Sequence, residues 1–192
     1  MRIPKLTISG GPVMGLASML LPWLLIIAVL LAAGCTRQAG ADAPEEKDEL
    51  AEAIESWIAL GDMAALYNPG LTLTDRVEIG RAVYYYSALH DLPPKLVVSI
   101  IVVESSGVPD AVSPKGAVGL MQVMPWWPAE LGVEADLYDI DDNIRLGTFI
   151  LADNIRRWGP EEGVARYFWG SGRIPDGRYL AAVMKTMEGL GG

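Results

Sequence analysis

The segment that most constrains this chain is 96–103, LVVSIIVV, in which seven of the eight residues are apolar. Such a segment has no polar face that could be exposed to water, so it must be buried in a core formed with other elements. Its β-branched residues would also suit a buried strand, and the pattern alone does not separate the two. The flanking patterns are helical and no partner strand is visible, so we predict a buried helix.

Apolar residues recur at helical spacing through the rest of the chain from Asp48 onward. We expect caps at Thr74–Asp75 and Asp142–Asn143, a helix end near Gly61, and a close helix contact at Gly147. The class is all-α with little or no sheet. The predicted helices cover 48–60, 75–90, 94–106, 126–131, 143–158, 161–169 and 179–190.

The first 34 residues have the pattern of an export signal, with Arg2 and Lys5 ahead of a short apolar block. The sequence Leu-Ala-Ala-Gly before Cys35 resembles a bacterial lipobox, in which the cysteine is lipidated and becomes the mature N-terminus. The alternative is an uncleaved anchor helix in which the cysteine is incidental. Cys35 is the single cysteine, so no disulfide can form within the chain.

Three segments are therefore expected: a lipoprotein signal peptide over 1–34, an acidic flexible tether over 35–47, and a folded domain over 48–192. Thr36 follows the cysteine where an aspartate would signal retention. This favours an outer-membrane lipoprotein that faces the periplasm and meets the membrane through its lipidated N-terminus.

The charge of the mature chain excludes one class of partner. Without residues 1–34 the chain keeps 13 basic residues against 24 acidic ones, a net charge of −11. Nucleic-acid binding depends mainly on neutralising phosphates with Lys and Arg, so no nucleic-acid partner is expected.

Glu104 is the candidate catalytic residue, because it follows the apolar segment directly and Gly107 can end the helix three residues later. Apolar neighbours and the negative end of the helix dipole both disfavour the charged carboxylate. A glutamic acid that stays protonated near pH 7 can act as the general acid in glycosidic bond cleavage. On its own this signal is weak, since most glutamates near helix ends are solvated.

Several motifs in register with Glu104 strengthen the case. Together they resemble, over about residues 77–183, the lytic transglycosylase domain of the soluble lytic transglycosylase type. The motifs are Glu104-Ser105, the segment 113–117 (Ser-Pro-Lys-Gly-Ala), the segment 119–122 (Gly-Leu-Met-Gln), and the segment 142–147 (Asp-Asn-Ile-Arg-Leu-Gly).

The resemblance implies a lysozyme-like helical domain that cuts peptidoglycan glycan strands between N-acetylmuramic acid and N-acetylglucosamine, without a cofactor. Glu104 would protonate the leaving oxygen and then take the proton of the C6 hydroxyl, which closes onto C1 as a 1,6-anhydro end. Common glycosidases use two carboxylates. Asp110, Asp139 or Asp141 could supply the second one if the enzyme is instead a water-using muramidase.

The resemblance also implies supporting roles around the cleft. Ser105 and Gln122 would hydrogen-bond the sugar or its N-acetyl group, and Met121 would form an apolar cleft wall, with core packing as the alternative. Tyr167 matches the tyrosine of the family's Ala-Tyr-Asn motif and would hydrogen-bond near Glu104. Tyr179 matches a tyrosine that opens the last helix, where core packing is the expected role and a cleft role is the alternative.

The chain departs from the family at Phe168, which stands where the motif has asparagine, so a silent peptidoglycan-binding lipoprotein is a further alternative. Trp126 and Trp127 are unusual after Met-Pro, and as neighbours in a helix they would face different ways, leaving at most one to stack on a sugar. The lone His90 and the absence of a His/Cys cluster indicate no metal site. Domains of this type also serve cell-wall and secretion machinery, so such partners stay open.

Overall fold

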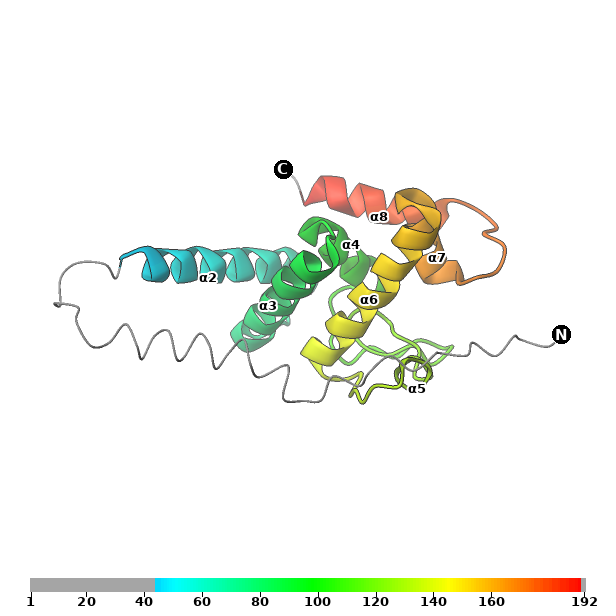
Figure 1. The fold of residues 1–192 in the computed structure, drawn as a ribbon, viewed down its shortest axis with the longest axis horizontal. Coiled ribbons are helices and arrows are strands. Elements are labelled where there is room, and N and C mark those ends of the chain that lie inside the picture. Colours follow the sequence, from blue (N-terminus) through cyan, green and yellow to red (C-terminus); the bar gives the residue numbers. More distant parts are fainter. Residues whose placement is uncertain (1–43, 191–192) are drawn as a thin grey trace, which may run out of the picture. The chain divides into compact units, whose positions relative to one another are not determined.

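The computed structural model describes residues 44–190. Within this part the chain forms helices and no named strand, which confirms the all-α class (Figure 1). The helices are α2 (Pro44–Ala65), α3 (Leu73–His90), α4 (Pro94–Ser105), α5 (Trp127–Leu131), α6 (Ile140–Trp158), α7 (Pro160–Trp169) and α8 (Arg178–Gly189).

The predicted signal peptide, Cys35 and the tether up to residue 43 lie outside the described residues. Helix α2 begins at Pro44, four residues before the expected start at Asp48. Of the helices in the described part, none is both long and apolar enough to span a membrane.

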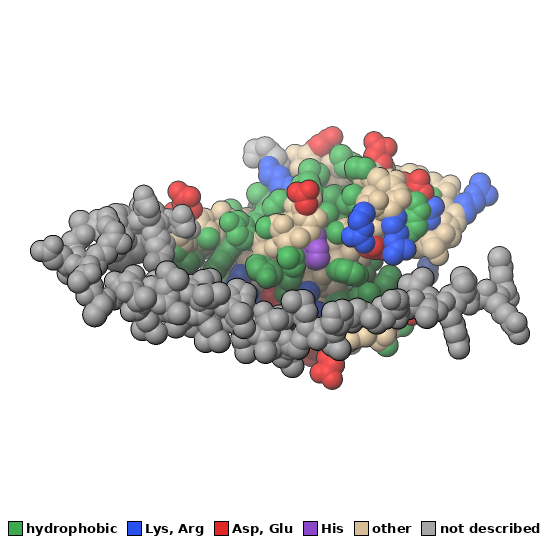
Figure 2. All heavy atoms as spheres, in the orientation of Figure 1, with side chains coloured by type: hydrophobic (Ala, Val, Ile, Leu, Met, Phe, Trp, Pro, Cys, Tyr) green, Lys and Arg blue, Asp and Glu red, His purple; other side chains and the backbone are tan. Residues whose placement is uncertain are grey.

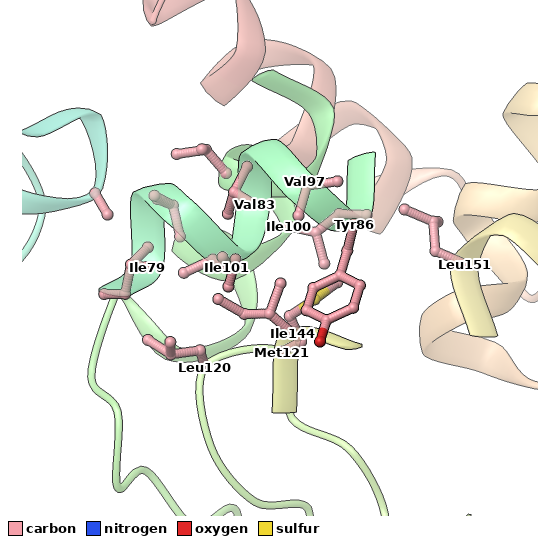
Figure 3. Packing of buried hydrophobic residues seen from close by; sticks show 14 of the residues in the cluster. Ile79, Val83, Tyr86, Val97, Ile100, Ile101, Leu120, Met121, Ile144 and Leu151 are labelled. Atoms are coloured by element: carbon pink, nitrogen blue, oxygen red, sulfur yellow. The ribbon is translucent and has the colours of Figure 1, made fainter. Parts of the chain in front are cut away.

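Helix α4 is the central buried element, as predicted. Seven of the eight residues of 96–103 are buried, and only Val103 reaches partial exposure. Helix α3 packs against α4 and α6, helix α8 packs against α4, and α7 lies against both α6 and α8. Figure 3 shows residues of α3, α4 and α6 meeting with Leu120 and Met121 of the loop that follows α4. Each fully buried Val or Ile contributes about 1.5–3 kcal/mol by leaving water.

Two expected helix boundaries are wrong. The start of α3 differs because another residue caps it, and the end of α2 differs because the glycine expected there serves a close helix contact. The N-cap of α3 is Thr72, whose hydroxyl accepts from the Asp75 amide while the Asp75 carboxylate accepts from the Thr72 amide. Gly61 lies inside α2 and does not end it. A Cβ there would sit 2.0 Å from the backbone oxygen of Arg76, so the glycine allows α2 to touch α3.

The start of α6 is also different from the prediction. Asp139 caps the helix by accepting from the Asp142 amide, which leaves Asn143 inside the first turn and buried. The Asn143 side chain accepts from the Met121 amide at 2.8 Å and donates to the carbonyls of Val118 and Leu137. Asn143 therefore fastens the loop after α4 to helix α6.

Gly147 was expected to allow a close contact between two helices, but the group packed against it is the side chain of Met121. A Cβ at Gly147 would lie 2.5 Å from the sulfur of Met121. The loop that carries Met121 is braced by isolated antiparallel bridges from Val118 to Val112 and to Val123. The loop between α4 and α5 is thus held from within and against α6.

Many hydrophobic side chains remain at the surface, and Figure 2 shows them among charged ones on one face. The large exposed apolar residues include Leu66, Leu73 and Leu89. Folded proteins carry much apolar surface, so single residues of this kind do not mark a site.

Candidate active site

Glu104 lies in the last turn of α4, with its side chain partly buried. The hydroxyl of Tyr179, at the second position of α8, donates a hydrogen bond of 2.6 Å to Glu104 Oε1. The residue after the helix, Ser106, takes the left-handed conformation (φ 55°), which turns the chain away and ends α4 next to the carboxyl.

Burial raises the pKa of the Glu104 carboxyl from 4.5 to about 7, and the hydrogen bond from Tyr179 opposes part of this rise because the donor favours the carboxylate. The negative end of the α4 dipole acts in the same direction as burial. A carboxyl with a pKa of about 7 carries its proton in a large fraction of molecules at neutral pH and releases it readily. It is therefore suited to act first as a general acid and then as a base.

Tyr167 on α7 lies beside Glu104, but its hydroxyl donates elsewhere. The acceptor is the Met121 backbone oxygen, at 2.7 Å. Burial and the negative charge of Glu104 both raise the pKa of Tyr167 well above 10, so its hydroxyl stays a donor at neutral pH. Tyr179, for which the sequence favoured core packing, is the residue that contacts the acid.

The side chains of Ser105 and Gln122 both donate hydrogen bonds to backbone carbonyls. The buried Ser105 hydroxyl donates to the Ile101 carbonyl at 3.0 Å, within its own helix. Gln122 has a φ of 50°, and its Nε2 donates to the carbonyls of Ala111 and Gly119. The amide oxygen of Gln122 is then the part of the side chain left to accept from a ligand.

Met121 is fully buried in the core, next to Gly147. This position agrees with core packing, the alternative to a cleft wall. Its backbone still matters to the site, because the Met121 amide donates to Asn143 and its carbonyl accepts from Tyr167. The loop after α4 is therefore fixed at this residue from α6 and from α7.

A groove of about 780 Å³ lies along α6 and α7, and neither Glu104 nor Tyr179 is among the residues that line it. Tyr167 and Phe168 are part of its wall. Trp126 and Trp127 also line it, with their rings stacked at 4.6 Å between centroids. The expectation that these two indoles face different ways is wrong, because Trp126 precedes α5 and is not inside it.

Phe168 stands between the groove and the Tyr179–Glu104 pair. Its ring is stacked on that of Tyr179, with centroids 4.9 Å apart and an angle of 18° between the planes. Half of its surface is exposed, at 50%. The departure from the family motif thus falls next to Tyr179, the residue that donates a hydrogen bond to the acid.

The aspartates considered as a second carboxylate have other partners. Asp141 pairs with Arg81 and accepts from the Tyr86 hydroxyl. Asp139 caps α6, and Asp110 is exposed in the loop after α4. In the described residues no group of three or more His, Cys, Asp or Glu side chains is gathered where it could hold a metal ion.

Two residues that build the site have contacts beyond the roles expected from the sequence, and one of them, Tyr179, is also packed in the core as expected. The contact of Tyr179 with Glu104 joins positions 75 residues apart, and the signal for it was the match of this tyrosine to the family's last helix. The loop-anchoring role of Asn143 had no such signal, because Asp-Asn before a helical pattern favours a cap.

Comparison with known proteins assigns the family. Residues 83–184, just over half of the 192 residues, match the model of the transglycosylase SLT domain. A transglycosylase of Enterobacteria phage PRD1 is 37% identical over 111 residues, which cover 55% of this chain and 42% of the phage protein. The endo-type membrane-bound lytic murein transglycosylase A of Klebsiella pneumoniae is 27% identical over 157 residues, covering 76% of this chain and 65% of that protein. This chain thus matches less than two thirds of the length of either relative.

Two solved structures are similar at greater distance. An inactive mutant of the lytic transglycosylase Slt from Pseudomonas aeruginosa has a TM-score of 0.45 and 23% identity, covering 57% of this chain and 21% of that one. The 70 kDa soluble lytic transglycosylase of Escherichia coli has a TM-score of 0.45 and 20% identity, covering 88% and 29%. On the match of residues 83–184, the chain belongs to the transglycosylase SLT domain family.

Proposed function

We propose that this chain is a peptidoglycan lytic transglycosylase that cleaves the β-1,4 bond between N-acetylmuramic acid and N-acetylglucosamine and leaves 1,6-anhydro ends. The observation that carries the proposal is Glu104, a carboxyl with a pKa of about 7 at the end of a buried helix in a domain of this family. The two relatives named transglycosylases support the same reaction class.

The reaction needs one carboxyl that gives a proton and then takes one. Glu104 donates its proton to the glycosidic oxygen as the bond to C1 breaks, so the leaving sugar departs with a neutral hydroxyl. The resulting carboxylate accepts the proton of the C6 hydroxyl, and that oxygen bonds to C1 of the same muramyl residue. No water enters the product. Because the Tyr179 hydroxyl occupies Oε1, the proton is exchanged at Oε2.

Four residues are proposed to help hold the glycan. Gln122 accepts from the sugar or its N-acetyl group through its amide oxygen, and the Ser105 hydroxyl accepts in addition to the bond it donates within α4. Met121 and Tyr167 contribute indirectly: the hydrogen bond from the Tyr167 hydroxyl to the Met121 carbonyl fixes the loop after α4.

The proposed site of action is the cell envelope. Residues 1–34 would direct export, and lipidation at Cys35 would tie the domain over 48–192 to the outer membrane through the tether over 35–47. The Klebsiella relative is named as membrane-bound, which supports an envelope location. In cells grown with radiolabelled palmitate, we expect the wild-type protein to be labelled and the Cys35→Ser protein to be unlabelled. Equal labelling of both would overturn the lipoprotein assignment.

The reaction is tested by digesting purified sacculi with wild type and Glu104→Gln side by side and analysing the products by mass spectrometry. We expect 1,6-anhydro-muramyl ends with wild type and none with the variant. Reducing muramyl ends would indicate a water-using muramidase. Wild type that binds sacculi without cutting them would indicate a silent binding lipoprotein, the alternative that Phe168 motivates.

A further inference from the structure

Phe168 is the last residue but one of α7, and it lies in an aromatic cluster with Tyr179 and Trp169. The ring planes of Phe168 and Tyr179 differ by 18°, whereas the planes of Phe168 and Trp169 are perpendicular, with centroids 4.8 Å apart. Stacked and edge-to-face pairs at these distances are favourable beyond the area that they bury. Two aromatic neighbours from α7 and α8 therefore hold the Phe168 ring in one orientation.

The exposed part of Phe168 lines the groove. Both phenylalanines of the chain and four of its six tryptophans line this groove, so aromatic residues are concentrated there. Aromatic faces stack on the apolar face of sugar rings, and the exposed half of Phe168 is available to a sugar in this groove.

We propose that Phe168 is a positioning and specificity-determining residue, which holds the Tyr179 ring against Glu104 with one face and stacks on the sugar in the adjoining groove with the other. This inference rests on the proposed function, because it assigns a role in binding and cutting a glycan. The asparagine of the family motif can donate a hydrogen bond at this place, but it has no ring and cannot stack on Tyr179.

Phe168 affects Glu104 through the orientation of the Tyr179 ring. The Tyr179 hydroxyl reaches Oε1 at 2.6 Å only while the long axis of its ring keeps its present direction, and the Phe168 ring stacked on it opposes a swing of that axis toward Phe168. Phe168 lines the groove and Tyr179 behind it is buried, so the Phe168 ring lies between Tyr179 and the groove. The titratable groups that face Glu104 are Tyr179 from α8 and Tyr167 from α7.

The test compares Phe168→Ala, Phe168→Asn and Phe168→Tyr with wild type on soluble glycan strands, by kcat, KM and the pH profile of kcat/KM. Loss of the ring in Ala or Asn is expected to lower kcat by roughly threefold to tenfold and to raise KM severalfold. The alkaline limb should move to lower pH by about half a unit, because burial is the larger influence on Glu104 and water now enters. Phe168→Tyr keeps the stack and should stay within about twofold of wild type.

Tyr138→Ala is the matched control, since Tyr138 is exposed to a similar extent, at 56%, and does not line the groove. It should leave all three readouts unchanged. If Phe168→Ala fails to fold by circular dichroism, Phe168→Leu replaces it, because leucine fills the space without a ring.

The outcomes separate this inference from the function on which it rests. A wild type that cuts glycan strands while Phe168→Ala and Phe168→Asn show wild-type kcat, KM and pH limb would overturn the role of Phe168 alone. A folded wild type that makes no cut would overturn the proposed function. Loss of activity in Phe168→Tyr equal to that in Phe168→Ala would also overturn the inference, since stacking would then not be what matters.

Discussion

Replacing Glu104 by glutamine is expected to stabilise the protein at neutral and alkaline pH and to have little effect in acid. Glutamine keeps the shape of the side chain and an oxygen that can accept from Tyr179, but it cannot ionise. In wild type the pKa of Glu104 is higher in the folded state than in the unfolded chain. As pH rises, the unfolded chain releases this proton first, and unfolding becomes more favourable.

The magnitude follows from the two pKa values. The folded value of about 7 against 4.5, at about 1.4 kcal/mol per pH unit, corresponds to about 3 kcal/mol of stability lost by wild type. The loss begins near pH 4.5, grows up to about pH 7, and is constant above, where the carboxyl is ionised in both states. The variant does not undergo this loss, so it should be more stable than wild type by about 3 kcal/mol at pH 8.

The assay is urea unfolding of both proteins from pH 4 to pH 9, followed by tryptophan fluorescence, with the difference in the free energy of unfolding plotted against pH. Glu188→Gln, which changes an exposed carboxylate on α8, is the control and should give a flat difference. A flat difference for Glu104→Gln as well, or one that grows toward acid, would refute the reasoning, because the carboxyl would then not be held in its protonated form by burial.

Three further results are expected. Tyr179→Phe removes the donor that lowers the pKa of Glu104, so the alkaline limb of the pH–rate profile should move to higher pH and kcat should fall; Tyr167→Phe, whose hydroxyl does not donate to the acid, should leave the limb in place. Asn143→Ala leaves the Met121 amide and the Leu137 carbonyl without their partner, while the Val118 carbonyl keeps its bond from the Val123 amide; the variant should cost about 2 kcal/mol or more in urea unfolding, and stability equal to wild type would contradict the anchoring role. Gly147→Ala places a Cβ 2.5 Å from the sulfur and 2.7 Å from the Cβ of the buried Met121 and should cost about 1–3 kcal/mol by the same measurement, and stability equal to wild type would contradict the tight contact.

Local patterns were sufficient to predict each helix of the described part. The run 96–103 had to be buried whichever structure it formed, and helical neighbours decided between helix and strand. The acid could be predicted only with the help of the motifs in register with it, because an apolar run and a helix end next to Glu104 are a weak signal by themselves. The structure shows that burial is the main cause of its raised pKa. Errors occurred at boundaries, where Thr72 and Asp139 cap the helices in place of the residues expected.

The surroundings of the acid depend on contacts between distant segments. Tyr179 reaches Glu104 only because α8 packs on α4, and Tyr167 reaches the loop after α4 because α7 packs beside α8. The same packing places Phe168 on Tyr179. Periodicity and capping arise from neighbours within a few positions along the chain, so the sequence by itself determined the helices and the position of the candidate acid. Pairs that are tens of residues apart are joined by the packing of whole helices, so only the tertiary structure decided which hydroxyl holds the carboxyl and which ring covers it.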